Sequence, residues 1–438
     1  MKNPIDDHIL RIAIPSIISN ITIPLLGLVD IAIVGHMENI AYIGAVSIGS
    51  MMFNLTYWLF SFLRMGTSGI TSQLLGKRDL PETVSTLIRS ILIALVLAAI
   101  IIIAQQPLFD LFMSIIKPDK DIIPFIKTYF YIAIWGAPAV LCLNSLTGWL
   151  IGMQNTRTPM MVSIGQNIIN IFISLTLVYG LNMKIEGVAI GTVLAQYAGL
   201  LIALSLIGKH YMRLLKYFQK NNLFLTSSIF QLFSVNRDIF FRTFCIVFTN
   251  LYFTSTGAQL GTIILSANTV ILQFYLLFSY IMDGFAYAGE ALGGRLYGAQ
   301  NLTTFRLMIK RLFGWALIMT IIYTALYTFF GMRFVEILTN EENVIQAIRP
   351  YIYWAWAIPL AGAAAFIWDG VFIGTTSTKA LLTSAAVSTI CFWAICQLTT
   401  PIIGNHGLWL AMITYLALRG IILTYIYLQS DKYKSVTD

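Results

Sequence analysis

Long apolar segments follow one another along the whole chain, separated by glycine, proline and charged residues. Each segment has about 20 residues or more, enough for a helix to cross a bilayer, whereas strands of a membrane barrel have about ten residues and alternate in polarity. We therefore expect an all-α integral membrane protein with twelve transmembrane helices. The expected spans are 9–35, 41–72, 85–115, 124–151, 159–181, 187–208, 236–258, 263–294, 306–335, 347–374, 380–402 and 407–429.

The second half of the chain repeats the pattern of the first half. "SQLLGKRD" (72–79) aligns with "GRLYGAQN" (294–301), and Trp135 aligns with Trp356 at nearly the same offset. Because each half has an even number of spans, both halves share one orientation, as in transporters that place their substrate path between parallel repeats. We expect two six-helix bundles and a cytoplasmic linker, over residues 1–212, 225–438 and 213–224 respectively.

The composition excludes a soluble protein, because 58% of the residues are hydrophobic, 11% are charged and the mean hydropathy is +0.79. A soluble domain carries about 25% charged residues. The net charge of +8 comes from basic residues in short loops between apolar segments, such as "LLGKRD" and "RLMIKRLFG". This distribution is typical of the positive-inside rule and places both termini in the cytoplasm. It does not indicate a nucleic-acid partner.

The sequence shows no sign of a metal site or an enzyme. The four cysteines lie in apolar segments without metal-ligand spacing or a disulfide framework, and none of the four histidines pairs with another at ligand spacing. No nucleophile motif or phosphate-binding loop is present. We therefore expect no catalytic residue, no metal and no cofactor.

Asp30 is an acidic residue inside the first expected span, within "GLVDIAIVG". An ionisable group in a span indicates function by default, because its insertion costs roughly 2.5–3.5 kcal/mol. Pro15 and Pro24 lie on the same helix, and each removes a backbone hydrogen bond and allows a bend. Burial favours the neutral carboxyl, so protonation of Asp30 can let the helix change shape. The alternative is an aspartate that a neighbouring Asn or Ser satisfies without titrating. The aligned residue of the second half is Tyr252, so the fold does not require an acid here.

Polar residues of the next spans are candidates for a pocket around Asp30. They are, from the fourth, fifth and sixth spans in turn, Tyr129, Tyr131 and Asn144; Asn167, Asn170 and Ser174; and Thr192 and Gln196. The fifth-span residues are three or four positions apart and therefore share one face of a helix. Ordinary hydrogen bonding between helices is the alternative for each of them.

The spans of the second half contain ionisable residues of their own, namely Asp283, Glu290, Asp369 and Arg419. They meet only if the eighth, tenth and twelfth spans pack together. A charge-balanced structural cluster and a transport site are both open interpretations. Arg64 lies near the inner end of the second span. We expect its long side chain to extend so that the guanidinium reaches the membrane interface.

These residues resemble the multidrug and toxic compound extrusion (MATE) family, and within it the bacterial DinF-like branch. The resemblance covers the whole chain in order. It rests on "RIAIPSIISNITIPLLGLVDIAIVGH" in the first span, "FLRMGTSGITSQLLGKRD" closing the second, and "MDGFAYAGEALGGRLYGAQN" closing the eighth. It also includes "WGAPAV" and "GWLIGMQNTRTP" in the fourth span and "LWLAMITYLALRG" in the twelfth.

The resemblance implies a V-shaped transporter in which two six-helix bundles face each other across a cleft and give alternating access. It implies antiport that exports drug-like, cationic or amphipathic organic compounds in exchange for H⁺ or Na⁺, with Asp30 coupling the cation and proline-dependent bending of its helix. We expect a monomeric multi-pass protein of the bacterial cytoplasmic (inner) membrane. Its expected partners are the lipid bilayer and small organic substrates.

The chain departs from this branch at Ser174. The branch commonly has a second carboxylate there, four residues after the asparagine that corresponds to Asn170. A hard cation prefers several oxygens with compensating charge, so the departure favours H⁺, while the remaining oxygens leave Na⁺ open. A flippase for a lipid-linked oligosaccharide is the alternative function. It would favour a strongly cationic cavity and often two further spans.

Overall fold

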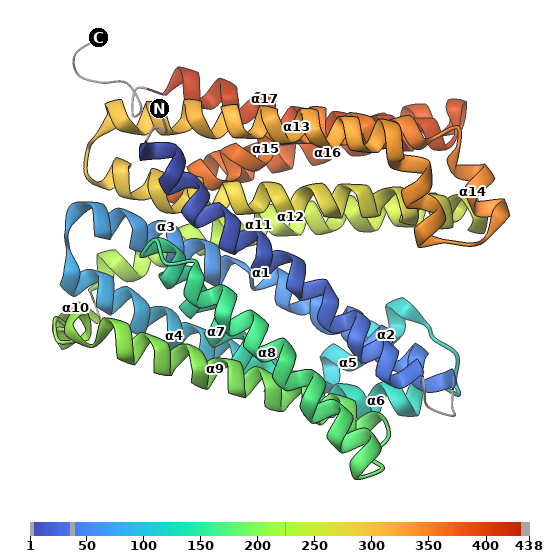
Figure 1. The fold of residues 1–438 in the computed structure, drawn as a ribbon, viewed down its shortest axis with the longest axis horizontal. Coiled ribbons are helices and arrows are strands. Elements are labelled where there is room, and N and C mark those ends of the chain that lie inside the picture. The colour runs from blue at the N-terminus through green and yellow to red at the C-terminus, as the bar shows by residue number, and fades with distance from the viewer. Residues whose placement is uncertain (1–3, 36–39, 224, 431–438) are drawn as a thin grey trace. The chain divides into compact units, whose positions relative to one another are not determined.

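The computed structural model describes residues 4–35, 40–223 and 225–430, and within these ranges the chain is helical or in short turns, without strands. Figure 1 shows long helices throughout both halves of the chain. The helices are α1 (Pro4–Gly35), α2 (Ile40–Leu59), α3 (Phe62–Lys77), α4 (Leu80–Ile103), α5 (Gln105–Ile116), α6 (Ile123–Ala133), α7 (Ala137–Gly152), α8 (Arg157–Leu175), α9 (Ile185–Leu215), α10 (Lys220–Leu223), α11 (Thr226–Gln259), α12 (Thr262–Gly298), α13 (Leu302–Leu338), α14 (Glu342–Ile348), α15 (Ile352–Gly374), α16 (Thr378–Ile403) and α17 (Asn405–Gln429).

Ten helical stretches of the described residues are long and apolar enough to cross a membrane. They coincide with ten of the twelve expected spans, and the other two expected spans lie in α1 and α11. α11 contains Arg237, Asp238 and Arg242, and these charged side chains lower its hydropathy. The all-helical prediction is confirmed for the described ranges.

Proline interrupts two of the expected spans. The span 85–115 is wrong in its second part, because α4 ends at Ile103 and a separate helix begins at Gln105. Pro107 has no N–H to donate to the carbonyl four residues earlier, so the helix does not continue. The span 124–151 is divided by a 3₁₀ turn just before Pro138, which lies in the first turn of α7.

The chain forms two compact units. Pro15–Phe233 make up one, here called the N unit, and Met1–Ile14 with Ser234–Asp438 make up the other, the C unit. The boundaries fall inside α1 and α11, so each unit contains the first turns of the helix that opens the other half.

The first turns of α1 are anchored on α13 within the C unit. Asp6 Oδ1 accepts a hydrogen bond of 3.2 Å from Trp315 Nε1, and Asp6 Oδ2 lies 3.6 Å from the guanidinium of Arg311. Asp6 also lies in the first turn of its helix, where a carboxylate complements the helix dipole. The start of α1 is therefore held by both charge and hydrogen bonding.

Arg89 of α4 anchors the end of the linker within the N unit. Its guanidinium donates to the carbonyls of Asn222 at 2.7 Å and Leu223 at 3.1 Å, and to Glu82 Oε1 at 3.1 Å. Arg89 is only 5% exposed. A buried guanidinium needs such partners, and here they tie α10 to α4.

Both units contain the same close contact between two helices. A Cβ on Gly148 of α7 would lie 2.2 Å from the carbonyl oxygen of Arg64 on α3. In the C unit a Cβ on Gly370 of α15 would lie 2.0 Å from the carbonyl oxygen of Ala286 on α12. Glycine permits backbones to approach this closely in a membrane. Gly370 and Ala286 each follow their N-unit counterparts by about 222 residues, so the internal repeat is confirmed.

Candidate functional site

The site residue proposed from the first span lies on a long helix with two internal prolines. α1 contains Pro15, Pro24 and Asp30. The backbone of Asp30 is helical, and its side chain lies outside the described part of the structure. Pro15 is buried and Pro24 is partly buried. Each proline denies α1 one backbone hydrogen bond, and α1 nevertheless runs through both as one helix.

Polar residues of α8 join α1 to α9 within the N unit. Asn167 Nδ2 donates a hydrogen bond of 2.7 Å to the backbone carbonyl of Thr22 on α1. About one turn further along α8, Asn170 Nδ2 donates to Thr192 Oγ1 on α9 at 3.1 Å. The amides therefore engage neighbours on two sides of α8, one of which is the helix that contains Asp30.

Two oxygens on α8 are buried without a hydrogen-bond partner in the described part of the structure. They are Asn170 Oδ1 and Ser174 Oγ, and both residues are 0% exposed. Gly191 of α9 passes so close that a Cβ there would lie 2.3 Å from Ser174 Oγ. Both oxygens have lone pairs available to a polar hydrogen or a small cation. Together they indicate a polar site on α8.

The remaining candidates of the N unit lie on α6, α7 and α9. Tyr129 is 3% exposed, and its hydroxyl lies 3.4 Å from Ser50 Oγ on α2. The ring of Tyr131 packs against phenylalanine rings of α5 and α6. Asn144 and Gln196 are partly buried. These contacts of the two tyrosines are with α2, α5 and α6, whereas the two buried oxygens lie on α8.

Asp369 of α15 binds two arginines in the C unit. Its Oδ2 atom accepts a hydrogen bond from Arg419 of α17 at 2.5 Å and another from Arg242 of α11. The three residues are 8%, 4% and 5% exposed respectively. The structure therefore brings Asp369 and Arg419 together and adds a second cation, so that two guanidinium groups share one buried carboxylate.

Arg242 is the partner that the sequence analysis missed. It lies inside the expected span 236–258. An ionisable residue within a span is costly to insert and therefore indicates function, so the sequence alone could have identified Arg242 as a candidate. The other two acidic candidates of this half lie on α12, where Glu290 is 1% exposed and Asp283 is partly buried. Among the residues that the structure describes, no group of three or more His, Cys, Asp or Glu side chains is placed to hold a metal ion.

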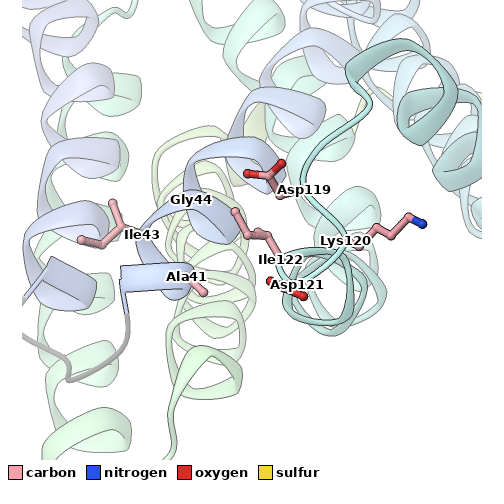
Figure 2. A pocket seen from close by; sticks show the side chains of 7 residues that line it. All are labelled: Ala41, Ile43, Gly44, Asp119, Lys120, Asp121 and Ile122. Carbon is pink, nitrogen blue, oxygen red and sulfur yellow. The ribbon is translucent and has the colours of Figure 1, made fainter.

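A surface pocket of about 550 Å³ lies between the start of α2 and the turn before α6. Its lining residues are Ala41, Ile43, Gly44, Asp119, Lys120, Asp121 and Ile122. Figure 2 shows the side chain of Lys120 pointing away from the α2 residues. Asp119 and Asp121 are exposed, so water already solvates both carboxylates. None of the lining residues is a candidate from the sequence, and the pocket adds no site.

Comparisons with known proteins agree with this architecture. The family model described as MatE matches residues 15–176 and 239–397. The chain is 34% identical to "DNA damage-inducible protein F" of Escherichia coli (strain K12), over 96% of this chain and 92% of that protein. It is 23% identical to "Probable multidrug resistance protein NorM" of Photorhabdus laumondii, over 95% and 94% of the two chains. A solved structure, "Crystal structure of MATE in the bent conformation", is similar with a TM-score of 0.88 at 17% identity, over 99% of this chain and 97% of that one.

Proposed function

The chain belongs to the MatE family, and from this premise we propose that it exports drug-like or toxic organic compounds across the bacterial cytoplasmic membrane in exchange for H⁺. Members of the family are efflux transporters and not enzymes. The proposal includes cationic or amphipathic substrates, a monomeric protein, cytoplasmic termini, and the two bundles over 1–212 and 225–438. Asp30 is its cation-coupling residue.

The observation that carries the proposal is the construction of α1. This helix contains Asp30 and two prolines, and its backbone is bonded to α8 at Thr22. Proline sites are where a helix bends, and a protonatable carboxyl on the same helix is a means of triggering that bend. The buried oxygens of Asn170 and Ser174 supply a polar environment on the neighbouring helix α8.

In this mechanism a proton that enters from outside neutralises Asp30. A neutral carboxyl costs far less to bury than a carboxylate, so α1 is free to bend at its prolines and to reduce the space available to substrate in the N unit. The substrate then leaves to the outside. Loss of the proton to the cytoplasm restores the carboxylate and the straight helix.

The choice of H⁺ over Na⁺ rests on Ser174. A sodium site in a membrane needs several oxygens with compensating negative charge. Ser174, Asn170 and Thr192 contribute oxygens without charge, so Asp30 is the only carboxylate that the proposal assigns to this site. A single carboxyl suffices for a proton.

We expect Asp30→Asn to abolish gradient-driven efflux of a lipophilic cation such as ethidium from proteoliposomes, because an amide cannot take up and release a proton. The matched control is Asp119→Asn, which removes the charge of an exposed aspartate and should leave efflux unchanged. Gradients of H⁺ and Na⁺ are imposed separately. Efflux by the Asp30→Asn variant at the wild-type rate would falsify the assignment of Asp30. Efflux that is driven by a Na⁺ gradient but not by a H⁺ gradient would show that Na⁺, and not H⁺, is the coupling ion.

The arginines of the C unit bear on the alternative function, a flippase. A flippase for an anionic lipid-linked oligosaccharide favours a strongly cationic cavity, and Arg242 adds a cation to the C unit. However, Arg242 and Arg419 are both buried and both bind Asp369. Their charge is engaged within the protein, which supports efflux over lipid-linked oligosaccharide transport.

A further inference from the structure

We propose that the cluster of Asp369, Arg242 and Arg419 in the C unit binds one small monovalent anion such as chloride. The three residues come from α15, α11 and α17, and they are 8%, 5% and 4% exposed respectively. The site is separate from Asp30, which belongs to the N unit. The proposal therefore goes beyond the proposed function and does not depend on cation coupling.

The cluster carries more positive than negative charge. Oδ2 of Asp369 accepts a hydrogen bond from Arg419 at 2.5 Å, and the same oxygen pairs with Arg242. A guanidinium stays protonated in proteins, so neither arginine can lose its charge. Two guanidinium groups that share one carboxylate leave one positive charge unmatched among side chains that are almost fully buried.

Arg419 is too deep in its helix to carry its charge to the membrane surface. At 1.5 Å per residue it lies about 21 Å from the first residue of α17, Asn405, and about 15 Å from the last, Gln429. A charge at such a depth is costly to leave without a counter-charge. A bound anion supplies that counter-charge and stabilises the cluster.

Two hydrogen-bond donors of the cluster are buried without a partner in the described part of the structure. They are Nε of Arg419 and the hydroxyl of Tyr415, which lies one turn earlier on α17 and is 2% exposed. Cζ of Arg419 lies 5.6 Å from the centre of the Tyr415 ring, so the two residues are neighbours. A cationic N–H and a hydroxyl are the donors that hold an anion.

Oδ1 of Asp369 is a third buried atom of the cluster without a partner among the described residues. It is an acceptor, so an anion does not satisfy it. A water molecule can donate one hydrogen to Oδ1 and the other to the anion. The unpartnered atoms are thus accounted for by one anion and one water.

Burial limits the size of the ligand. The side chains of the cluster are at most 8% exposed, so they enclose a space for a single ion and not for a large polyanion. The site differs in this respect from the open cationic cavity that a lipid-linked oligosaccharide flippase favours. We therefore assign it a small inorganic anion.

Asp283 of α12 is the acid that could replace the anion. It is partly buried and interacts electrostatically with Tyr275, which also interacts with Asp369 and Arg419. The ion pairs of the two arginines are with Asp369. If Asp283 supplied the second negative charge, the cluster would be neutral and would need no anion, so Asp283 is included in the test.

The test measures the binding of radioactive chloride to the purified protein in detergent by scintillation proximity, with gluconate keeping the ionic strength constant. We expect saturable binding of one chloride per chain that bromide displaces and gluconate does not. Size-exclusion chromatography and thermal unfolding check that each variant is folded. The absence of saturable binding to the unchanged protein overturns the proposal.

Arg242→Gln makes the cluster neutral while Arg419 keeps its pair with Asp369. We expect this variant to lose saturable chloride binding, and Arg242→Lys to retain it because the charge remains. The matched control is Arg333→Gln on α13 of the same unit, which removes the charge of an exposed arginine and should leave binding unchanged. Wild-type affinity in Arg242→Gln, or an equal loss in Arg333→Gln, would indicate an adventitious ion only and overturns the proposal.

Tyr415→Phe keeps the proposal testable if Arg242→Gln does not fold, because it removes one donor and leaves the charge unchanged. We expect it to raise the dissociation constant for chloride about ten-fold, and an unchanged constant contradicts the site. Asp283→Asn tests the other counter-charge. Chloride binding that appears only in Asp283→Asn would show that Asp283 neutralises the cluster in the unchanged protein, which overturns the proposal.

Discussion

At the residue scale, the charge count around Asp369 decides which substitutions the C unit tolerates. One carboxylate serves two arginines, and all three side chains are buried. Removing one arginine leaves a neutral pair, whereas removing the carboxylate leaves two like charges facing each other out of water. Buried charges without a partner are among the most destabilising changes known.

We expect Asp369→Asn to lower the free energy of unfolding by roughly 3–5 kcal/mol. Arg242→Gln should cost less, because Arg419 still pairs with the carboxylate. Thermal unfolding of both purified variants in the same detergent compares them. Equal destabilisation by the two substitutions would show that charge count does not control this cluster.

At the element scale, glycine sets how closely the helices of each unit approach. A Cβ at Gly148 or Gly370 would overlap a backbone carbonyl of the facing helix, and backbone cannot move aside as a flexible side chain can. The contact is the same in both units although the surrounding side chains differ. The apolar pattern alone does not distinguish such a glycine from one that faces lipid.

We expect Gly370→Ala to lower the midpoint of thermal unfolding, because α12 and α15 must separate to admit the methyl group. Gly208→Ala on α9 is the control, since a Cβ there meets nothing within 4 Å. In a helix interior that control gains about 0.5–1 kcal/mol of stability from the change. A Gly370→Ala protein as stable as the control contradicts the close approach of α12 and α15.

At the scale of the whole molecule, the internal repeat extends to details of the backbone. Asp79 caps α4 by accepting from a backbone N–H at 3.1 Å, and Asn301 caps α13 in the same way at 3.1 Å. The residues before these caps, Arg78 and Gln300, both have positive φ. Two halves with equal turns and an even number of spans share one orientation in the membrane.

This topology predicts which turns face outward. A cysteine replacing Lys120, which is exposed in the turn before α6 (Figure 2), should react with a membrane-impermeant maleimide in intact cells. A cysteine replacing Tyr217, 52% exposed after α9, should react only after the membrane is permeabilised. The opposite pattern would invert the assignment of the termini to the cytoplasm.

The sequence by itself determined the all-α membrane class, most of the spans, the repeat and the candidate on α1. These features follow from hydropathy, proline and charge, which act locally and can be read directly from the sequence. It missed the end of α4, although Gln105, Gln106 and Pro107 interrupt the apolar run there, because apolar residues resume at Leu108.

Only the tertiary structure decided which residues meet. The pairing of Arg242 with Asp369, the bond from Asn167 to Thr22 and the contact of Tyr179 with Ile33 all join helices distant in sequence. Partner choice depends on helix rotation and crossing, which hydropathy leaves open because many packings bury the same apolar faces. The spans are thus local properties of the chain, and the site is a property of their packing.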